Sequence, residues 1–223
     1  MAILKPVVFD GGMQRQILSG DVVGGTEILS SQTTAGSGTL TAALLTSGII
    51  NRTGPGAGYT DTTDTAQNII NALVAGYNYN ANAGLSTGVA VQSGTTFRLR
   101  YINTVAFAMT LAAGSGVTIT ANGNVNVSSV KDYLLTVVNG TPTQIYAVNQ
   151  VNASAVITGM TQAQTAALSV GMVVTGTSLS GSIISIQQGV GVTLSANASA
   201  TLNLNTATFS PAVSIVGLGQ MLL

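Results

Sequence analysis

The spacing of apolar residues changes along the chain, and with it the structure that the sequence predicts. Ala66, Ile69, Ile70 and Leu73 recur at intervals of three and four residues and form one apolar stripe. This stripe predicts an amphipathic helix near residues 62–74. It is the one segment whose spacing predicts a helix of several turns.

Beyond this helix the period shortens to two. Phe97, Leu99 and Tyr101 alternate with Arg98 and Arg100, so the apolar and basic side chains fall on opposite faces of one strand. Short apolar segments separated by Gly and Asn turns continue to the C-terminus, which is typical of an antiparallel sandwich or barrel. The predicted fold class is therefore mainly β, an antiparallel β-sandwich of jelly-roll-like build with one amphipathic helix.

The patterning divides the chain into three segments. Residues 1–38 offer too few apolar positions for a core of their own, so we expect an extended N-terminal arm that packs on another surface. The arm ends in a flexible linker at residues 31–38, which are rich in Gly, Ser and Thr. Residues 39–150 form the predicted β-sandwich domain with the helix, and residues 151–223 form a smaller C-terminal β-module.

The charge content excludes several classes of function. The 223 residues include 6 Lys or Arg and 6 Asp or Glu, with no His, Cys or Trp, so 5% are charged where about 25% is usual. Six scattered cations cannot form the basic footprint of a nucleic-acid-binding protein. Catalysis by imidazole or thiolate and the common transition-metal sites lack their side chains. We expect neither an enzyme nor a cofactor.

The same composition bears on where the protein works. Residues 1–6 have neither the basic stretch nor the apolar core of a signal peptide, and no apolar run approaches the roughly 18 residues of a membrane span. We expect a protein that is made in the cytoplasm and has no membrane partner. Isolated soluble domains rely on surface charge to stay apart. A surface of Ser, Thr, Asn, Gln and Gly instead favours a component of an assembly.

Asp61 and Asp64 are the only carboxylates close together in the sequence. They could form half of a calcium site, since hard cations prefer oxygen ligands. The favoured interpretation is a helix start, in which Thr62 or Thr63 caps the helix and Asp64 lies in its first turn. The glycine-rich segment 54–58 is interpreted as a loop, because no lysine follows in the register of a phosphate-binding loop.

Two further features admit a binding role. Arg98 and Arg100 could grip an acidic partner, but an ion-paired sheet face is favoured. Tyr77 and Tyr79 could form a sugar-binding tip, but an ordinary loop is favoured. Residues 213–223 are apolar and uncharged, so we expect them to be buried against a neighbouring subunit.

Three stretches of the sequence resemble virion proteins of tailed bacteriophages. Residues 4–21 look like the short N-terminal arm of phage decoration and fibre proteins. The segment 62–73, followed by strands within 97–118, is similar to small β-rich proteins of the cement or head-fibre type on phage heads. Residues 168–177 with 192–198 are similar to a β-module that is widespread in phage structural proteins.

The resemblance implies a capsid decoration (cement) protein, a non-catalytic virion protein on the capsid surface. We expect it to form a homotrimer and to bridge subunits of the major capsid protein, without nucleic acid. The alternative is a tail-fibre or head-fibre adhesin that binds host-surface glycans through Tyr77 and Tyr79. The expected partner-binding residues lie in the arm and in the basic pair: Lys5, Pro6, Phe9, Arg15, Ile17, Leu18, Arg98 and Arg100.

Overall fold

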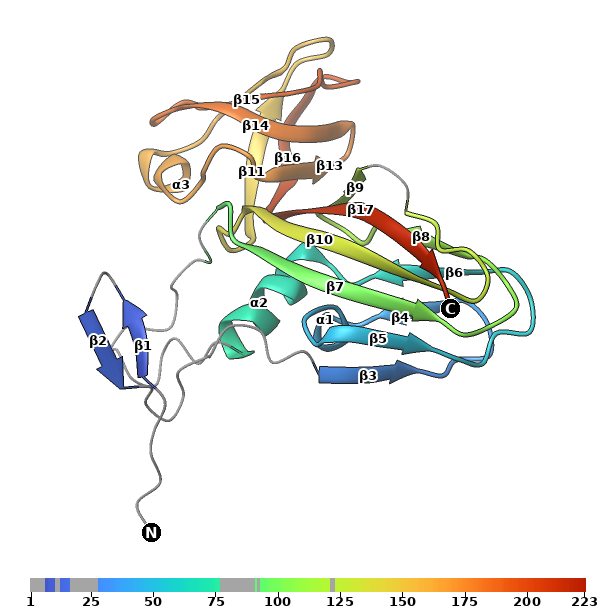
Figure 1. Ribbon diagram of the computed structural model, residues 1–223. Coiled ribbons are helices and arrows are strands. Elements are labelled where there is room, and N and C mark those ends of the chain that lie inside the picture. The colour runs from blue at the N-terminus through green and yellow to red at the C-terminus, as the bar shows by residue number, and fades with distance from the viewer. Residues whose placement is uncertain (1–6, 11–12, 17–27, 77–90, 92, 121–122) are drawn as a thin grey trace.

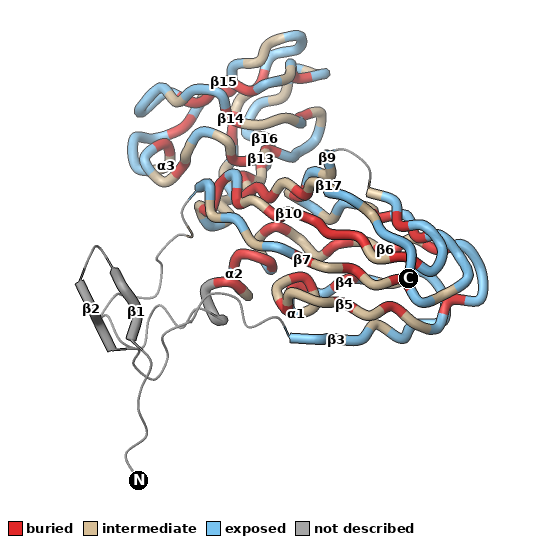
Figure 2. Tube along the Cα trace, viewed as in Figure 1, coloured by how far each residue is buried: buried red, intermediate tan, exposed pale blue. Residues whose placement is uncertain are grey.

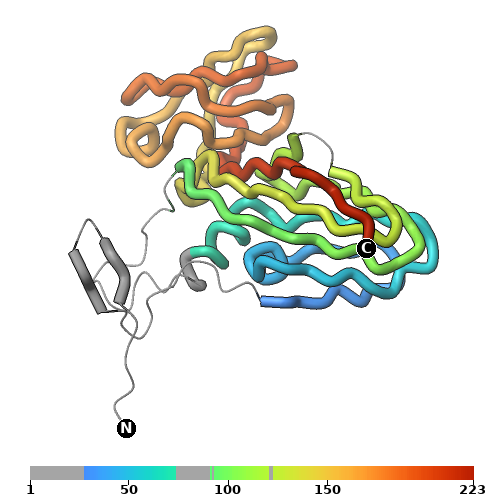
Figure 3. The backbone as a smooth tube through the Cα atoms, in the orientation of Figure 1, coloured from blue at the N-terminus to red at the C-terminus, as the bar shows by residue number. Residues whose placement is uncertain are grey.

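A computed structural model gives the fold, which is mainly β, as the sequence predicts. The residues that it describes are 7–10, 13–16, 28–76, 91, 93–120 and 123–223. Figure 1 shows a broad two-layer body of strands with two helices at one end, and a small barrel above it. Figure 3 follows the chain from the body into the barrel and back.

The largest sheet of the body has six strands and mixes parallel with antiparallel pairs. Their order is β3 (Ile28–Gln32), β5 (Gly48–Arg52), β7 (Thr96–Asn103), β10 (Ser129–Asn139), β17 (Ala212–Leu222) and β9 (Val117–Thr120). The pairs β3–β5, β5–β7 and β17–β9 are parallel, and β10 is antiparallel to both of its neighbours.

The second layer is a three-stranded, wholly parallel sheet. It consists of β4 (Gly38–Leu40), β6 (Tyr59–Thr63) and β8 (Met109–Ala112). Each of these strands directly follows β3, β5 or β7 in the sequence. The chain therefore winds through both sheets three times, laying one strand in each layer per turn, as in a short β-solenoid.

The parallel pairs correct the prediction of an antiparallel sandwich for this part of the chain. Alternation with a period of two identifies a strand, but it carries no information about the direction of its neighbour. Direction depends on the connection, because parallel neighbours need a long crossover whereas antiparallel ones can share a hairpin. Here the crossovers pass through the other layer and through helices α1 (Ala42–Leu45) and α2 (Ala66–Gly76).

Helix α2 confirms the predicted helix and shifts its start. The four residues of the apolar stripe are buried in the core of the body. Thr62 and Thr63 belong to strand β6, so neither is the cap. Thr65 instead accepts a hydrogen bond at Oγ1 from the amide of Asn68, and Asp64 lies just before the helix. The threonines that favoured a cap in the sequence extend the preceding strand.

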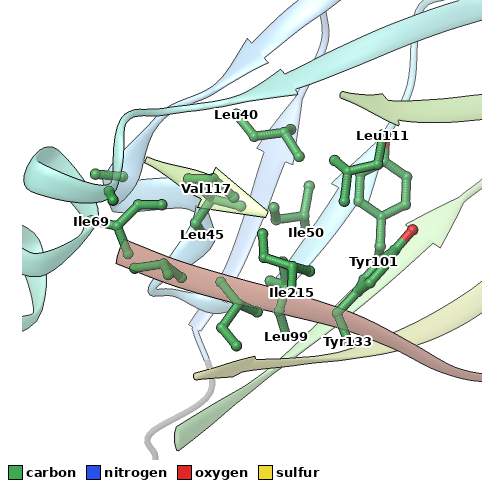
Figure 4. Packing of buried hydrophobic residues seen from close by; sticks show 14 of the residues in the cluster. Leu40, Leu45, Ile50, Ile69, Leu99, Tyr101, Leu111, Val117, Tyr133 and Ile215 are labelled. Atoms are coloured by element: carbon green, nitrogen blue, oxygen red, sulfur yellow. The ribbon is translucent and has the colours of Figure 1, made fainter. Parts of the chain in front are cut away.

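The core of the body lies between the two layers and the helices (Figure 4). Leu40, Ile50, Leu99, Leu135 and Ile215 are among its completely or almost completely buried members, and they come from both sheets. Figure 2 shows this buried interior against the exposed edge strand β3. The three turns of chain and the returning strand β17 thus share one hydrophobic core.

The barrel is closed and antiparallel throughout. Around it run β11 (Gln144–Gln150), β12 (Val156–Thr158), β15 (Gly191–Leu194), β14 (Leu179–Gln187), β13 (Val173–Gly176) and β16 (Leu202–Ser210). A short helix, α3 (Gln162–Ala166), begins with a capping box formed by Thr161 and Gln164. The barrel has its own hydrophobic core, separate from that of the body.

The boundaries between the sheets of the structure differ from the predicted domain boundaries. The barrel begins at β11, before residue 151, and ends at β16, while β17 returns to the six-stranded sheet. The barrel is thus inserted between two strands, β10 and β17, that pair with each other. Residues 31–38, predicted to be a flexible linker, include the end of β3, a turn and the start of β4.

Hydrogen bonds fix the barrel to the body at the insertion point. Asn139, at the end of β10, donates from Nδ2 to Ser169 Oγ and to the Val170 carbonyl, each at 2.8 Å. Gln67 of α2 accepts at Oε1 from both the amide and the hydroxyl of Thr143, each at 2.8 Å.

The insertion predicts that the body folds without the barrel. Asn139 and Ala212 are register partners, so an Asn-Gly turn in place of residues 140–211 would join β10 to β17 as a two-residue hairpin. We expect the shortened chain to unfold cooperatively. Its free energy of unfolding should fall by about 1 kcal/mol for each hydrogen bond removed at the junction. Urea unfolding followed by circular dichroism measures this, and a non-cooperative transition would contradict it.

Candidate partner-binding surfaces

The outer face of the six-stranded sheet carries the predicted basic pair. Arg98 and Arg100 project from β7 on the side away from the core, and both meet Asp132 of β10. Arg98 Nη2 lies 2.7 Å from Asp132 Oδ2, and Arg100 Nε lies 2.9 Å from Oδ1. Hydrogen bonding from Arg100 is the largest cause that lowers the pKa of Asp132. The favoured interpretation of an ion-paired sheet face is confirmed.

Apolar side chains surround this ionic cluster on the same face. The strand register places Leu29 beside Ile49, Leu134 beside Val216, and Ile102, Val130 and Met221 in one row across three strands. Their side chains are partly or largely exposed. Asn51 lies beside Ile102, and its buried Oδ1 finds no donor among the described residues. This face, with Arg98 58% exposed, is a candidate docking surface.

The opposite side of the same sheet holds a buried ion pair that the sequence pattern did not indicate. Arg52 of β5 and Asp61 of β6 have no exposed side-chain surface. Arg52 Nε donates to Asp61 Oδ2 at 2.9 Å, and Nη2 donates to Oδ1 at 3.1 Å. The pair joins the two layers of the body within one turn of chain.

The remaining hydrogen bonds of Arg52 go to backbone carbonyls, three of them in the preceding turn of chain and one in the next residue. They reach the carbonyls of Gln32, Thr34, Gly36 and Thr53. A guanidinium group has five N–H donors and no acceptor, and here every nitrogen has at least one partner. The stretch predicted as a flexible linker is therefore folded around one buried cation.

Tyrosines extend this network. Tyr101 donates to Asp61 Oδ2 at 2.7 Å, and Tyr59 donates to Asn103 Oδ1 at 3.0 Å. The guanidinium carbon of Arg52 lies 4.8 Å from the centre of the Tyr59 ring, within cation–π range. Burial raises the pKa of both phenols, most strongly that of Tyr101. Both stay protonated at neutral pH, so the network acts as a structural unit.

The two carboxylates that could have shared a calcium ion serve separate purposes. Asp61 accepts from Arg52, Tyr101 and the amide of Gly38. Asp64 accepts from Asn68 and the amides of Ala42 and Thr65; burial raises its pKa, but these bonds together lower it below its usual value. These separate sets of partners favour the structural interpretation of the two carboxylates over a shared calcium ion. The described residues contain no group of three or more His, Cys, Asp or Glu side chains that could hold a metal ion.

The remaining predicted sites are placed only in part. Lys5, Pro6, Ile17 and Leu18 lie outside the described residues, as do Tyr77 and Tyr79. Phe9 lies in β1 (Val7–Asp10) and Arg15 in β2 (Met13–Gln16), which form an antiparallel hairpin with Val8 and Arg15 as register partners. The glycine-rich segment 54–58 is a loop, as predicted.

The C-terminal strand corrects another expectation. Val213 and Ile215 are buried in the core of the body, so a neighbouring subunit is not needed to cover them. Further along β17, by contrast, Leu218, Met221 and Leu222 are exposed, together with Leu223. Within this stretch, the apolar surface that a partner could cover consists of these four residues and the partly exposed Val216 on the outer face of the sheet.

Few charges remain on the surface of the body and the barrel. Seven of the 12 charged side chains lie beyond residue 27, and none lies beyond Asp132. Three of the seven, Arg52, Asp61 and Lys131, are completely buried. Lys131 donates from Nζ to the Asn124 carbonyl at 2.7 Å, and burial lowers its pKa. Ionic surface on the described body is thus confined to the Arg98–Arg100–Asp132 cluster and Asp64.

Among the described residues, no helix is both long and apolar enough to cross a membrane. Comparison with protein-family models, with curated proteins and with solved structures finds no match for this chain.

The buried pair predicts a large difference between two identical substitutions. Arg52→Met leaves the Asp61 carboxylate buried without its partner, so we expect the free energy of unfolding to fall by about 3–5 kcal/mol. Arg98→Met removes an exposed partner of Asp132 and serves as the matched control, with a loss below about 1 kcal/mol. Urea unfolding of both variants measures the difference, and equal losses would contradict the structural role of Arg52.

The Asp132 cluster predicts a pH dependence. Because the pKa of Asp132 is lowered in the folded state, its contribution is complete above the unfolded value of about 3.9 and is lost as the pH falls through the folded value. Asp132→Asn should therefore lower stability at pH 7, by about 1 kcal/mol for a partly exposed cluster, and make little difference at pH 2. Urea midpoints at the two pH values test this; a difference that persists at pH 2 would argue against it.

Proposed function

We propose that the protein is a capsid decoration protein, a non-catalytic structural component on the outside of a tailed-phage head. The observation that carries the proposal is the nearly uncharged exterior combined with large exposed apolar side chains on β3, on β17 and on the barrel. Free soluble proteins use surface charge to stay apart. A neutral, partly apolar exterior supports close packing among other proteins, where like charges would repel.

In this proposal the N-terminal arm binds across neighbouring subunits of the major capsid protein. The hairpin β1–β2 forms a sheet of its own, which shares no strand pairing with the other described sheets. A two-stranded hairpin is at best marginally stable alone in water, so docking on a partner would stabilise it. Lys5, Pro6, Phe9, Arg15, Ile17 and Leu18 are the proposed contacts within the arm.

The body would sit on the shell as a homotrimer, with its two layers acting as a rigid sandwich. The outer face of the six-stranded sheet, with Arg98 and Arg100, is the proposed second contact with the capsid. Each arm and each sheet face contributes a modest contact, and their connection in one trimer raises the overall affinity. The mechanism is mechanical, because contacts that span the seams between capsid subunits oppose their separation.

The proposal predicts a high copy number. In purified virions of the phage that encodes it, we expect hundreds of copies, measured by quantitative gel electrophoresis against the major capsid protein. A dozen copies or fewer would overturn the shell-wide role and leave the fibre adhesin as the function to test.

Removal of the arm tests the second part of the proposal. A chain that begins at residue 28 should keep the circular dichroism and thermal unfolding of the body, because both hydrophobic cores lie beyond this point. It should fail to bind particles that lack the protein. Addition of the full chain to the same particles is the positive control, and undiminished binding of the shortened chain would place the capsid contact elsewhere.

A further inference from the structure

The barrel has no charged side chain. No Asp, Glu, Lys, Arg or His occurs between residue 133 and the C-terminus, so the whole barrel is built from neutral residues. Its exterior nevertheless exposes several large aliphatic side chains. An average domain of this size would carry more than a dozen charges at the usual fraction of about 25%.

The most exposed of these side chains is held in an unfavourable backbone conformation. Leu204 of β16 is 73% exposed and has a φ of 53°, in the left-handed region. Strand β16 contains one extra residue here, because Val148 and Gln150 pair with Asn205 and Leu202. Glycine usually occupies the left-handed position of such a bulge. A leucine there is strained, and it holds an apolar side chain in water.

Two exposed valines lie on the outer side of the barrel near the same end as Leu204, on the neighbouring segments that follow β11 and begin β12. Leu204 donates its amide to Asn149 Oδ1 at 2.9 Å, and Asn149 points outward because Val148 and Gln150 are buried. Val151 follows on the outward side, 58% exposed. Val156 lies across from it, 46% exposed, one step beyond the pair of Gln150 and Ile157.

These three residues, Leu204, Val151 and Val156, form what we call the tip patch. They lie where β11 ends and where β12 and β16 begin, at the end of the barrel that points away from the six-stranded sheet (Figure 1). None of the sheets of the body covers this end.

We propose that the tip patch binds the tip patch of a second copy of this chain. A partner with charged side chains would lose their hydration on contact, and nothing on the barrel could compensate with an opposite charge. The barrel itself is a surface without any such group, and two copies meet without repulsion. Strain at Leu204 is offset once its side chain is buried between the copies.

The chemistry of the patch argues against a glycan as its partner. Sugar recognition relies on aromatic faces beside polar groups, whereas the tip patch is aliphatic. Tyr146, the only ionisable side chain of the barrel, packs its ring against Phe209 and donates its hydroxyl hydrogen to Gln144.

The tip patch is small, because three side chains bury far less than the roughly 800 Å² per partner of a stable interface. The contact is therefore weak alone and effective among copies held close together.

The absence of cysteine in the chain allows a direct test in the full-length protein. Asn152→Cys places a single exposed thiol beside Val151, and Gln187→Cys places one on β14, across the barrel from β11. Mild oxidation at increasing protein concentration should yield disulfide-linked dimers of Asn152→Cys at least about tenfold faster than of Gln187→Cys. Equal rates would overturn the proposal, since random collision does not distinguish the two sites.

Substitutions separate the contact from a structural effect. Leu204→Asn suits the left-handed conformation, so the barrel should remain folded with unchanged or higher thermal stability. In the Asn152→Cys background it should slow dimer formation about tenfold or more, as expected for the loss of one buried leucine. Ile184→Thr, which removes a 55% exposed side chain from β14, is the control and should leave the rate unchanged. Equal slowing by both variants would overturn the proposal.

Salt distinguishes this contact from one made through the ionic cluster on the body. Dimer formation of Asn152→Cys should not fall between 0.05 and 1 M NaCl, because the tip patch has no charges to screen. A steep fall would assign the contact to Arg98, Arg100 and Asp132 instead. The test is independent of the capsid: a fibre subunit with few copies per virion would give the same dimers, so the two proposals can fail separately.

Discussion

The body depends on one buried ion pair, Arg52 with Asp61. Its free energy cannot come from the ionic attraction alone, because the removal of two charges from water offsets much of it. What the pair supplies is geometry: one guanidinium binds a carboxylate in the second layer and carbonyls of the turn between β3 and β4. Because an unpartnered donor inside the body would be costly, these bonds favour the observed arrangement of the turn, in which every nitrogen of Arg52 has a partner. The first turn of the solenoid is thereby fixed to the second.

The sequence predicted the elements better than their partners. The apolar stripe of α2 and the alternation of β7 correctly predict a helix and a strand, because each pattern is a property of neighbouring residues. The parallel order of β3, β5 and β7 depends on contacts between residues far apart in the chain, which no local period encodes. The insertion of the barrel has no local signal for the same reason. The local pattern of β17 does not indicate that this strand leaves the barrel and pairs with β10 in the six-stranded sheet.

The candidate surface was predictable where it follows from alternation. Arg98 and Arg100 had to share a face, and an ion-paired face was the favoured interpretation, but Asp132 as their partner required the register of β7 with β10. The sequence does not mark Arg52 and Asp61 as a buried pair, because each has an ordinary setting: the arginine follows an apolar run, and the aspartate stands near a helix start. A lone charged residue within a β segment of a charge-poor chain is the signal that could have marked them.

The placement of the few charges follows a consistent physical logic. Those beyond residue 27 form bonds within the chain: the buried Arg52–Asp61 pair, the buried Lys131, Asp64 before α2, and one partly exposed cluster across β7 and β10. The barrel contains no charged residue. Without surface charge, solubility relies on hydroxyl and amide groups, and attraction between copies is opposed by little besides their hydration. Such an exterior is a liability for a protein that must remain dispersed, and an advantage for one whose copies work in contact. The strained leucine at the barrel tip is consistent with the second situation.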